Sequence, residues 1–388
     1  MSPFHRPISI AILAACVSTS GRATAARTLT VSDTEALYAA VNDPDNAGAA
    51  IVLGAGRYAL TALDSHGVAR PNGGRLELQP GMSLSGAAGR PEDVVIDASG
   101  PHGPSFASPQ GNTGAVRIGR SHETIEWLTV RGAASAAASI ATDLVGDRTT
   151  SLRIAHVIAE GSVRGIDVRN VGPAAAGRTI VIVLDDNELT ANTTNTGQGI
   201  RFVNANGANG AAVLASLHGN RSHDNLRGCL AANLASNGAS ITIDSHDDRF
   251  DHNQVGCVFS GGNTQSAAAV ANDNTITVTI HGGSFRDNVG VLQPDNEMGG
   301  LVVEGGRGEV AGATSRNSVQ VSLWGTTFDA NQGADVSAWG ARTTAAAPAG
   351  TDNVVSIDLH GASKEAMTDA IPSTPVEPAA TNRFTIVK

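Results

Sequence analysis

A short pattern that ends in asparagine recurs five times along the chain. The five fragments are LDDNELTAN, LHGNRSHDN, SHDDRFDHN, IHGGSFRDN and LWGTTFDAN, and they end at Asn192, Asn225, Asn253, Asn288 and Asn331. Successive asparagines are 33, 28, 35 and 43 residues apart. A constant local pattern at variable spacing is typical of a solenoid, in which coils of one cross-section are joined by loops of different length.

The residues around each asparagine predict parallel strands. Mainly apolar residues stand eight, ten and twelve positions before it, as in Ile180, Ile182 and Leu184, and this period of two indicates a half-buried strand. A second strand is expected after it, as at residues 199–203. Three positions before the asparagines, we expect an inward stack of Leu189, Ser222, Phe250, Phe285 and Phe328. Asparagine itself tolerates the left-handed turn conformation, and its amide can bond the coils above and below.

The first hundred residues carry a resemblance to a known superfamily. Ser32-x-x-Glu35 is a capping box that predicts a helix at about residues 33–42. It is followed by IVLGAGRYAL at residues 51–60, LELQPGMSLSG at residues 76–86 and VVID at residues 94–97. This order resembles the opening of the pectin-lyase-like superfamily. The resemblance implies an all-β fold, a right-handed parallel β-helix whose short N-terminal helix covers the open end of the solenoid.

The N-terminus reads as an export signal. Residues 8–17 form an apolar run after a short basic start, and Ala23-Thr24-Ala25 fits a signal peptidase site. We therefore expect a signal peptide at residues 1–25, a single β-helix domain at residues 26–388, and a secreted or periplasmic protein. The alternative is a lipobox, Leu13-Ala14-Ala15-Cys16, which would make the protein an outer-membrane lipoprotein attached to the membrane through Cys16.

Two cysteines remain outside the signal, and the repeat stacks them. Cys229 and Cys257 occupy the same position of the second strand on neighbouring coils, which are expected about 4.8 Å apart. A buried pair of free thiols and a disulfide both fit this placement, because stacked Cα atoms fall near the range that a disulfide permits.

The first candidate site lies on the outer face of the second strand. Asp167 and Arg201 share one column on neighbouring coils, and Arg169 follows two residues after Asp167. In polyuronate lyases, an arginine can act as the base while acidic residues hold Ca²⁺. No cofactor is required by the sequence, and Ca²⁺ is one that it would allow. The alternative is a surface ion pair without a catalytic role.

Two further candidates come from the repeat. Seven positions before the asparagines stand Asp185, His218, His246, His281 and Trp324, and His360 takes the matching place in a last copy. Such a column can bind a metal or serve as acid and base, as Asp185, His218 and His246 would, or it can be a by-product of repeat duplication. Asp247, Asp248 and Asp251 make this patch acidic, and Ca²⁺ is conceivable there. In the longest coil, Asp295 and Glu297 either flank a binding groove or belong to a solvated loop.

Several functions are disfavoured. The formal net charge of −10, which becomes −12 without the signal, argues against a nucleic-acid partner. The segment NQVGCVFSG at residues 253–261 is similar to the polygalacturonase strand that carries a catalytic aspartate pair, but Val255-Gly256 stands in place of the two aspartates. The chain also lacks the Asp-His strand motif and the Arg-x-Pro-x-x-Arg motif of pectate lyases, and aromatic residues make up only 3% of it.

Two functions remain open. One is an exported carbohydrate-active enzyme, a lyase or hydrolase that acts on a polysaccharide or oligosaccharide. The other is a non-catalytic surface or periplasmic protein that binds a glycan or a protein partner. For the second, Leu230, Val258 and Val302 would form an apolar stripe on the outer face, provided that Cys229 and Cys257 point inward.

Overall fold

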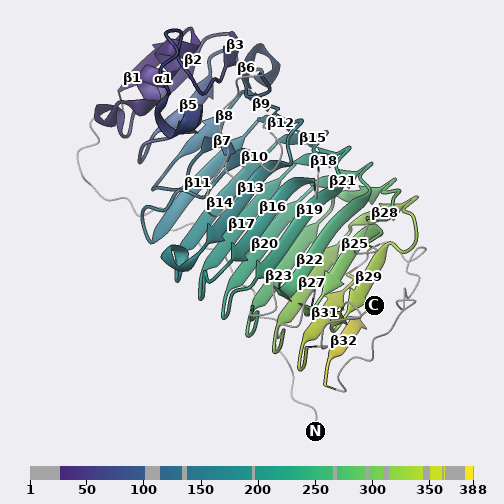
Figure 1. Ribbon diagram of the computed structural model, residues 1–388. Coiled ribbons are helices and arrows are strands. Elements are labelled where there is room, and N and C mark those ends of the chain that lie inside the picture. Colours follow the sequence, from purple (N-terminus) through teal and green to yellow (C-terminus); the bar gives the residue numbers. More distant parts are fainter. Residues whose placement is uncertain are drawn as a thin grey trace, which may run out of the picture.

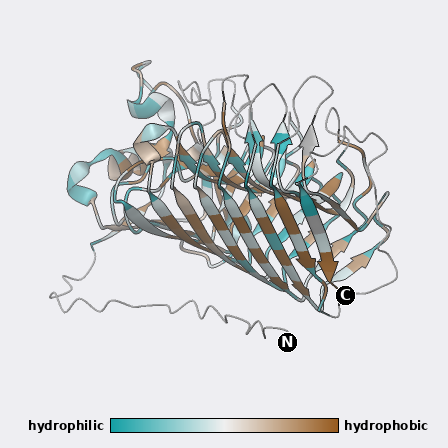
Figure 2. Ribbon diagram, turned by 90° about the horizontal axis from the view of Figure 1, so that it is seen from below, coloured by the Kyte–Doolittle hydropathy of each residue, from teal (hydrophilic) through white to brown (hydrophobic). Residues whose placement is uncertain are grey.

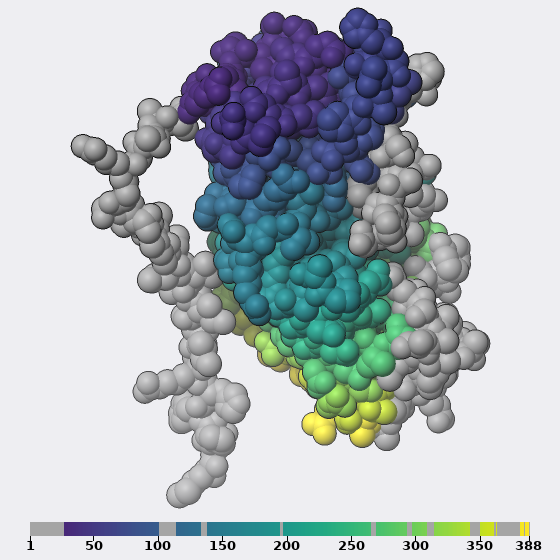
Figure 3. Space-filling model, turned by 60° about the vertical axis from the view of Figure 1, so that its left-hand side comes forward, coloured from purple at the N-terminus to yellow at the C-terminus, as the bar shows by residue number. Residues whose placement is uncertain are grey.

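The chain winds into a rod in which every turn contributes strands to three parallel sheets (Figure 1). The computed structural model describes residues 27–100, 114–132, 138–194, 197–264, 269–292, 297–308, 314–343, 350–360, 362 and 381–387. Within these residues it is a right-handed parallel β-helix, which confirms the predicted fold class and the fold implied by the superfamily resemblance. The chain advances from one end of the rod to the other without doubling back, as the colours in Figure 3 show.

The three sheets run along the length of the rod. The twelve-stranded sheet consists of β1 (Thr28–Val31), β2 (Ala50–Leu53), β5 (Ser83–Gly86), β8 (Thr124–Glu126), β11 (Thr149–Ala155), β14 (Thr179–Asp185), β17 (Ala212–His218), β20 (Ser240–His246), β23 (Thr275–His281), β27 (Ser318–Trp324), β31 (Val354–Asp358) and β32 (Arg383–Val387). The eleven-stranded sheet consists of β4 (Leu76–Glu77), β7 (Gly114–Arg117), β10 (Ala138–Ala141), β13 (Arg164–Val171), β16 (Gln198–Ala205), β19 (Arg227–Leu234), β22 (Val255–Thr264), β25 (Gly299–Glu304) and β29 (Val336–Trp339), with β26 (Arg307–Gly308) and β30 (Arg342–Thr343) beside them. The nine-stranded sheet consists of β3 (Gly56–Ala59), β6 (Val94–Asp97), β9 (Thr129–Arg131), β12 (Ile158–Glu160), β15 (Glu188–Thr190), β18 (Arg221–His223), β21 (Arg249–Asp251), β24 (Ser284–Arg286) and β28 (Thr327–Asp329).

The core is one continuous apolar column inside the rod. In β14, buried and half-buried residues alternate along the whole strand, as the period of two predicts. The same alternation of apolar and polar residues appears as bands across the strands in Figure 2. Phe250, Phe285 and Phe328 stack inside, with ring centroids 5.3 Å and 5.1 Å apart, so the predicted aromatic stack is confirmed.

Asparagine ladders hold neighbouring coils in register. The side-chain oxygen of Asn225 accepts hydrogen bonds from the backbone N–H and from Nδ2 of Asn192, both at 3.0 Å, and Asn225 donates in the same way to Asn253. The predicted role of the amide is therefore confirmed. The predicted conformation is wrong, because the left-handed residue is the one before each asparagine, as in Ala191 (φ 55°) and Asp224 (φ 55°). That residue turns the chain, and the asparagine after it points inward.

A short helix covers the N-terminal end of the rod (Figure 1). It is α1 (Thr34–Asn42), and its buried residues Leu37, Tyr38 and Val41 join the core. The cap is Asp33, whose Oδ1 accepts a 2.8 Å hydrogen bond from the backbone N–H of Ala36. The helix was expected, but the capping box with Ser32 was wrong. Asp33 lies one residue later and offers a carboxylate, which the positive helix N-terminus favours.

Single turns of 3-10 helix occupy corners of the coils, at Pro44–Asn46, Pro71–Gly74, Pro91–Asp93 and Pro173–Ala175.

The two cysteines lie inside the rod. Cys229 and Cys257 are paired in register across β19 and β22, and both are free and buried. Burial raises the pKa of the Cys257 thiol well above its usual value. The expected leader and Cys16 fall outside the described residues, among which no helix is long and apolar enough to cross a membrane.

Candidate functional site

One outward-facing column of the eleven-stranded sheet changes from charged to apolar along the rod. Strand register places its residues in the order Glu77, Arg117, Ala141, Asp167, Arg201, Leu230, Val258 and Val302. The residues beside them, such as Ile166 and Val168 in β13, belong to the core. The alternation along β13 therefore directs Asp167 and Arg169 to the outer side of the sheet.

The first predicted cluster is assembled by this register. Arg169 Nη1 lies 3.3 Å and Arg201 Nη1 lies 3.6 Å from Oδ2 of Asp167. The location on the surface was wrong: the exposed fraction of the Asp167 side chain is 0%, against 5% for Arg169 and 10% for Arg201. An exposed ion pair screened by water therefore does not describe this group.

Two more arginines, Arg164 and Arg227, lie close enough to lower the pKa of Arg201, and the sequence analysis did not predict them. Arg164 and Arg227 are both buried, and Arg164 Nε donates a 3.0 Å hydrogen bond to Oε1 of Gln198, which lies between the two in strand register. Each arginine is the first residue of its strand and stands directly before a glycine, at Arg164-Gly165 and Arg227-Gly228. This shared position before a glycine is the sequence signal by which the two arginines could have been found. Strict alternation would have placed Arg164 on the same side as Ile166.

Burial and like charge set the electrostatics of the cluster. Burial, followed by the positive charge of Arg164, lowers the pKa of Arg201 to about 9. Burial would raise the pKa of Asp167, but the guanidinium groups of Arg201, Arg169 and Arg164 outweigh it, and the pKa of Asp167 lies below its ordinary value. Asp167 is therefore an ionised carboxylate, and Arg201 releases its proton more easily than an ordinary arginine.

The hydrogen-bonding capacity of Arg201 is not used up within the protein. Its Nε and Nη1 are buried and have no hydrogen-bond partner among the described residues, and neither has Oδ1 of Asp167. A buried donor without a partner costs about 1–3 kcal/mol, more if it is charged. Such a group has spare capacity for a ligand that brings acceptor atoms.

The third predicted site is the pair Asp295 and Glu297. Of these two residues, Asp295 lies outside the described part of the chain. Glu297 is 1% exposed and binds two arginines, with Oε2 2.6 Å from Arg227 Nε and Oε1 2.7 Å from Arg307 Nη1. Burial would raise the pKa of Glu297, but these two guanidinium groups outweigh it and lower the pKa. In this structure Glu297 anchors Arg227 rather than lining an open groove.

The second predicted site lies on a different sheet. Strand register confirms the column of Asp185, His218, His246, His281 and Trp324 at the ends of strands of the twelve-stranded sheet. Asp185 Oδ1 is 3.1 Å from His218 Nδ1, and Asp185 Oδ2 is 3.1 Å from Arg153 Nη2. Asp185, His218 and His246 are thus brought together, on the outer face of a sheet other than the one that carries Asp167.

The acidic patch beside His246 is divided by the structure. Asp247 and Asp251 line a shallow pocket with Arg249 and Arg286. Asp248 is 1% exposed and lies inside the coil, where it accepts hydrogen bonds from Asn220 and Ser245. These carboxylates therefore do not converge on one side, as a Ca²⁺ site of several oxygen ligands would require.

The apolar stripe exists but is covered. Val258 and Val302 pack with Val255 and Leu292, and Leu230 contacts the same group. Val258 is 1% and Val302 is 0% exposed. The stripe is consequently not a free docking surface of the kind that a binding protein would present.

The fold and the cluster define a parallel β-helix that carries a buried, arginine-rich site on its eleven-stranded sheet. No family model matches the chain, and no curated protein matches it significantly. Among solved structures, it is similar to the A-module of mannuronan C-5 epimerase AlgE4 from Azotobacter vinelandii, with 14% identity, coverage of 92% of this chain and 96% of that chain, and a TM-score of 0.46. It is also similar to the A-module of the AlgE6 epimerase from the same organism, with 15% identity, coverage of 91% and 93%, and a TM-score of 0.44. At such low identity, neither similarity says anything about the activity of this chain.

Proposed function

We propose that the protein is an exported lyase that acts on an anionic polysaccharide of the uronate class. The observation that carries the proposal is the buried Arg201, whose pKa is lowered to about 9 and whose Nε and Nη1 have no hydrogen-bond partner in the described part of the chain. A lyase for such a substrate needs a base to remove the proton next to the sugar carboxylate, and positive charge to stabilise the carbanion that forms.

The residues of the cluster divide these tasks. Neutral Arg201 takes the proton from the carbon next to the carboxylate, the bond from the neighbouring carbon to the glycosidic oxygen breaks, and a carbon–carbon double bond forms. The departing oxygen takes up a proton. Arg164 and Arg169 supply the positive charge that the carboxylate and the developing carbanion need, and Asp167 holds Arg169 and Arg201 in place at 3.3 Å and 3.6 Å.

The same electrostatics favour elimination over hydrolysis. A hydrolase needs a carboxylic acid that keeps its proton until it protonates the leaving group. The carboxyl groups described at the cluster, Asp167 and Glu297, both have lowered pKa values because they face arginines. They remain ionised and cannot act as that acid.

Calcium does not fit these residues. Ca²⁺ takes six to eight oxygen ligands. The carboxylates described at the cluster are Asp167 and Glu297, and each of them faces two arginines. The proposed reaction therefore has no step that depends on Ca²⁺.

The test is a screen of the purified mature protein against polyuronates and neutral glucans. It records absorbance at about 235 nm, which reports the new double bond conjugated to the carboxylate, and new reducing ends. We expect absorbance with a polyuronate and a fall of about 10²-fold or more in Arg201→Ala, since this is the usual effect of removing a general base. Arg316→Ala is the matched control, because Arg316 is an exposed arginine paired with Asp273.

Three outcomes would contradict the proposal. Reducing ends without absorbance would indicate hydrolysis. Equal activity of Arg201→Ala and Arg316→Ala would remove Arg201 from the reaction. No product on any polyuronate, together with retention of the folded protein in a polyuronate gel, would indicate a non-catalytic glycan-binding protein.

A further inference from the structure

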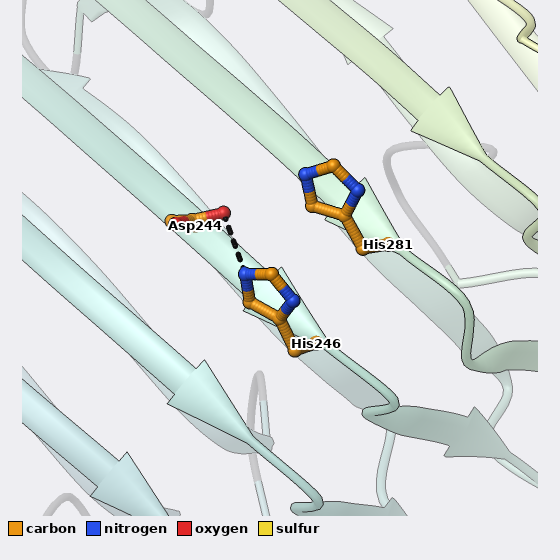
Figure 4. Close-up of side chains that lie close together, drawn as sticks. All are labelled: Asp244, His246 and His281. Carbon is orange, nitrogen blue, oxygen red and sulfur yellow. Dashed lines mark ion pairs between the residues drawn. The ribbon is translucent and has the colours of Figure 1, made fainter. Parts of the chain in front are cut away.

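A group of two histidines and one aspartate lies on the outer face of the twelve-stranded sheet (Figure 4). Asp244 and His246 are two residues apart in β20, so both side chains leave the same face. His281 of β23 is the register partner of His246. Asp244, His246 and His281 each offer a ligand atom, and these atoms all lie within 4.8 Å of one another.

We propose that Asp244, His246 and His281 bind a divalent transition metal ion such as Zn²⁺. Imidazole nitrogen and carboxylate oxygen are ligands that Zn²⁺ accepts, and three protein ligands with an open position are a common Zn²⁺ arrangement. Ca²⁺ requires six or more oxygen ligands and is not expected here. A metal at this place is independent of the arginine cluster, which lies on another sheet.

The binding capacity of these three side chains is largely unused. Asp244 forms an ion pair with His246, at 3.2 Å between Oδ1 and Nε2. His281 stacks between His246, at 4.7 Å, and Trp324, at 6.1 Å between ring centroids, and among the described residues its ring nitrogens take part in no hydrogen bond or ion pair. The exposed fractions of the His246 and Asp244 side chains are 40% and 34%, so an ion reaches them from solvent.

Other positions of the same column do not offer this set. His218 is paired with Asp185, and Asp185 also binds Arg153, so its carboxylate is already neutralised by a cation. His360 is paired with Asp358, but its ring stacks on Trp324, at 3.5 Å, rather than on a second imidazole. Within the described chain, β20 and β23 bring together two imidazoles in direct register, His246 and His281, and a carboxylate, Asp244, for which no arginine partner is found.

Metal binding requires a rotation of the rings. His246 and His281 are stacked with an angle of 14° between their planes, so their nitrogen lone pairs, which lie in the ring planes, are confined to nearly parallel planes. Coordination needs lone pairs that converge on one point. Both side chains are only partly buried, so each ring can turn about its side-chain torsions without displacing the core.

The test is a titration of the untagged full-length protein, without an added histidine tag. Calorimetry with ZnCl₂ measures affinity and stoichiometry, and visible absorption with CoCl₂ reports the coordination of the metal. We expect one strong site per chain. Affinity should fall by more than about tenfold in His246→Ala, His281→Ala and Asp244→Asn, because even outer partners of a metal site typically contribute tenfold or more.

Two controls separate this site from the rest of the surface. His218→Ala removes the neighbouring histidine of the column, and His252→Ala removes an exposed histidine paired with Asp287. Both should bind Zn²⁺ as the unchanged protein does. Asp244→Asn keeps the shape of the side chain, so its effect cannot be attributed to misfolding.

Absence of a Zn²⁺ or Co²⁺ signal in the folded protein would overturn the proposal. So would equal affinity in the unchanged protein and in His281→Ala. Loss of binding in His218→Ala but not in His281→Ala would place the metal one coil earlier and would equally refute the assignment made here.

Discussion

Asp248 occupies a position that its neighbours in the ladder fill with asparagine. In the two preceding coils, Asn187 Nδ2 donates to the carbonyl of Ile154, at 2.9 Å, and Asn220 Nδ2 donates to that of Leu184, at 2.8 Å. Leu217 is the register partner of Leu184, so its carbonyl would be the matching acceptor for residue 248. An ionised carboxylate has no proton to donate to it. We predict that Asp248→Asn stabilises the protein at neutral and alkaline pH.

The magnitude follows from the pKa of Asp248. Burial outweighs the hydrogen bonds from Ser245 and Asn220 and raises the pKa from 3.8 to about 6. Because the folded-state pKa is the higher one, the contribution of this group to stability is fully present below about pH 4 and is lost as the pH rises through about 6. At about 1.4 kcal/mol per pH unit, the loss is about 3 kcal/mol at pH 8, and about half of that at pH 5.

The assay is urea unfolding followed by circular dichroism, at pH 5 and pH 8. Asp248→Asn should unfold at a higher urea concentration than the unchanged protein at both values, with the larger gain at pH 8. Asp186→Asn is the control, because the side chain of Asp186 is 63% exposed and the residue precedes Asn187, two coils before Asp248. An equal gain at pH 5 and pH 8, or a loss at pH 8, would refute the reasoning.

Four further predictions concern the core and the cluster. Asn253→Ala should destabilise the protein by about 1–3 kcal/mol, measured by urea unfolding, because it leaves the buried N–H groups of Asn225 without an acceptor. Phe285→Ala should cost about 3–5 kcal/mol in the same assay, since it removes the middle ring of the stack. Asp167→Asn should lower the melting temperature, with little recovery at high ionic strength, because it leaves buried guanidinium groups without their counter-charge and salt screens buried charges much less than exposed ones. The Cys257 thiol should resist a thiol reagent at pH 8 until urea is added, because the thiol is buried and its pKa is raised.

Each of these has a result that would contradict it. Stability of Asn253→Ala within error of the unchanged protein would mean that its neighbours find other partners. A loss below about 1 kcal/mol in Phe285→Ala would show that the stack collapses around the gap. An unchanged melting temperature in Asp167→Asn, or a loss that added salt abolishes, would contradict the account of a buried charge cluster, and rapid labelling of Cys257 in the native protein would contradict its burial.

The fold was predictable because its determinants repeat. A pattern such as the Asn192 to Asn331 column is observed five times, so one irregular copy does not hide it. Features that occur once were less secure: Asp33, not Ser32, caps the helix. The left-handed residues include Ala191 and Ala330, whose side chains give no signal for that conformation.

The cluster was predictable in its composition but not in its surroundings. The period of two shows which side of the sheet Asp167 and Arg201 occupy, and the repeat shows that they are neighbours. Neither shows how deeply the two side chains are buried. Burial is a property of long-range packing, and it is burial that changes the pKa of Arg201 and separates this group from an exposed ion pair.

The asparagine ladder has a consequence for how the rod could lengthen. In this column Asn225 and Asn253 each accept a backbone N–H from the asparagine before them and donate their own backbone N–H to the asparagine after them, although they belong to different coils. Such a ladder keeps neighbouring coils in register, but it does not determine the number of coils. An inserted or deleted coil would leave all remaining rungs satisfied. The length of the rod must therefore depend on features that occur at one place along it. These are the helix at one end and the three stacked phenylalanines towards the other.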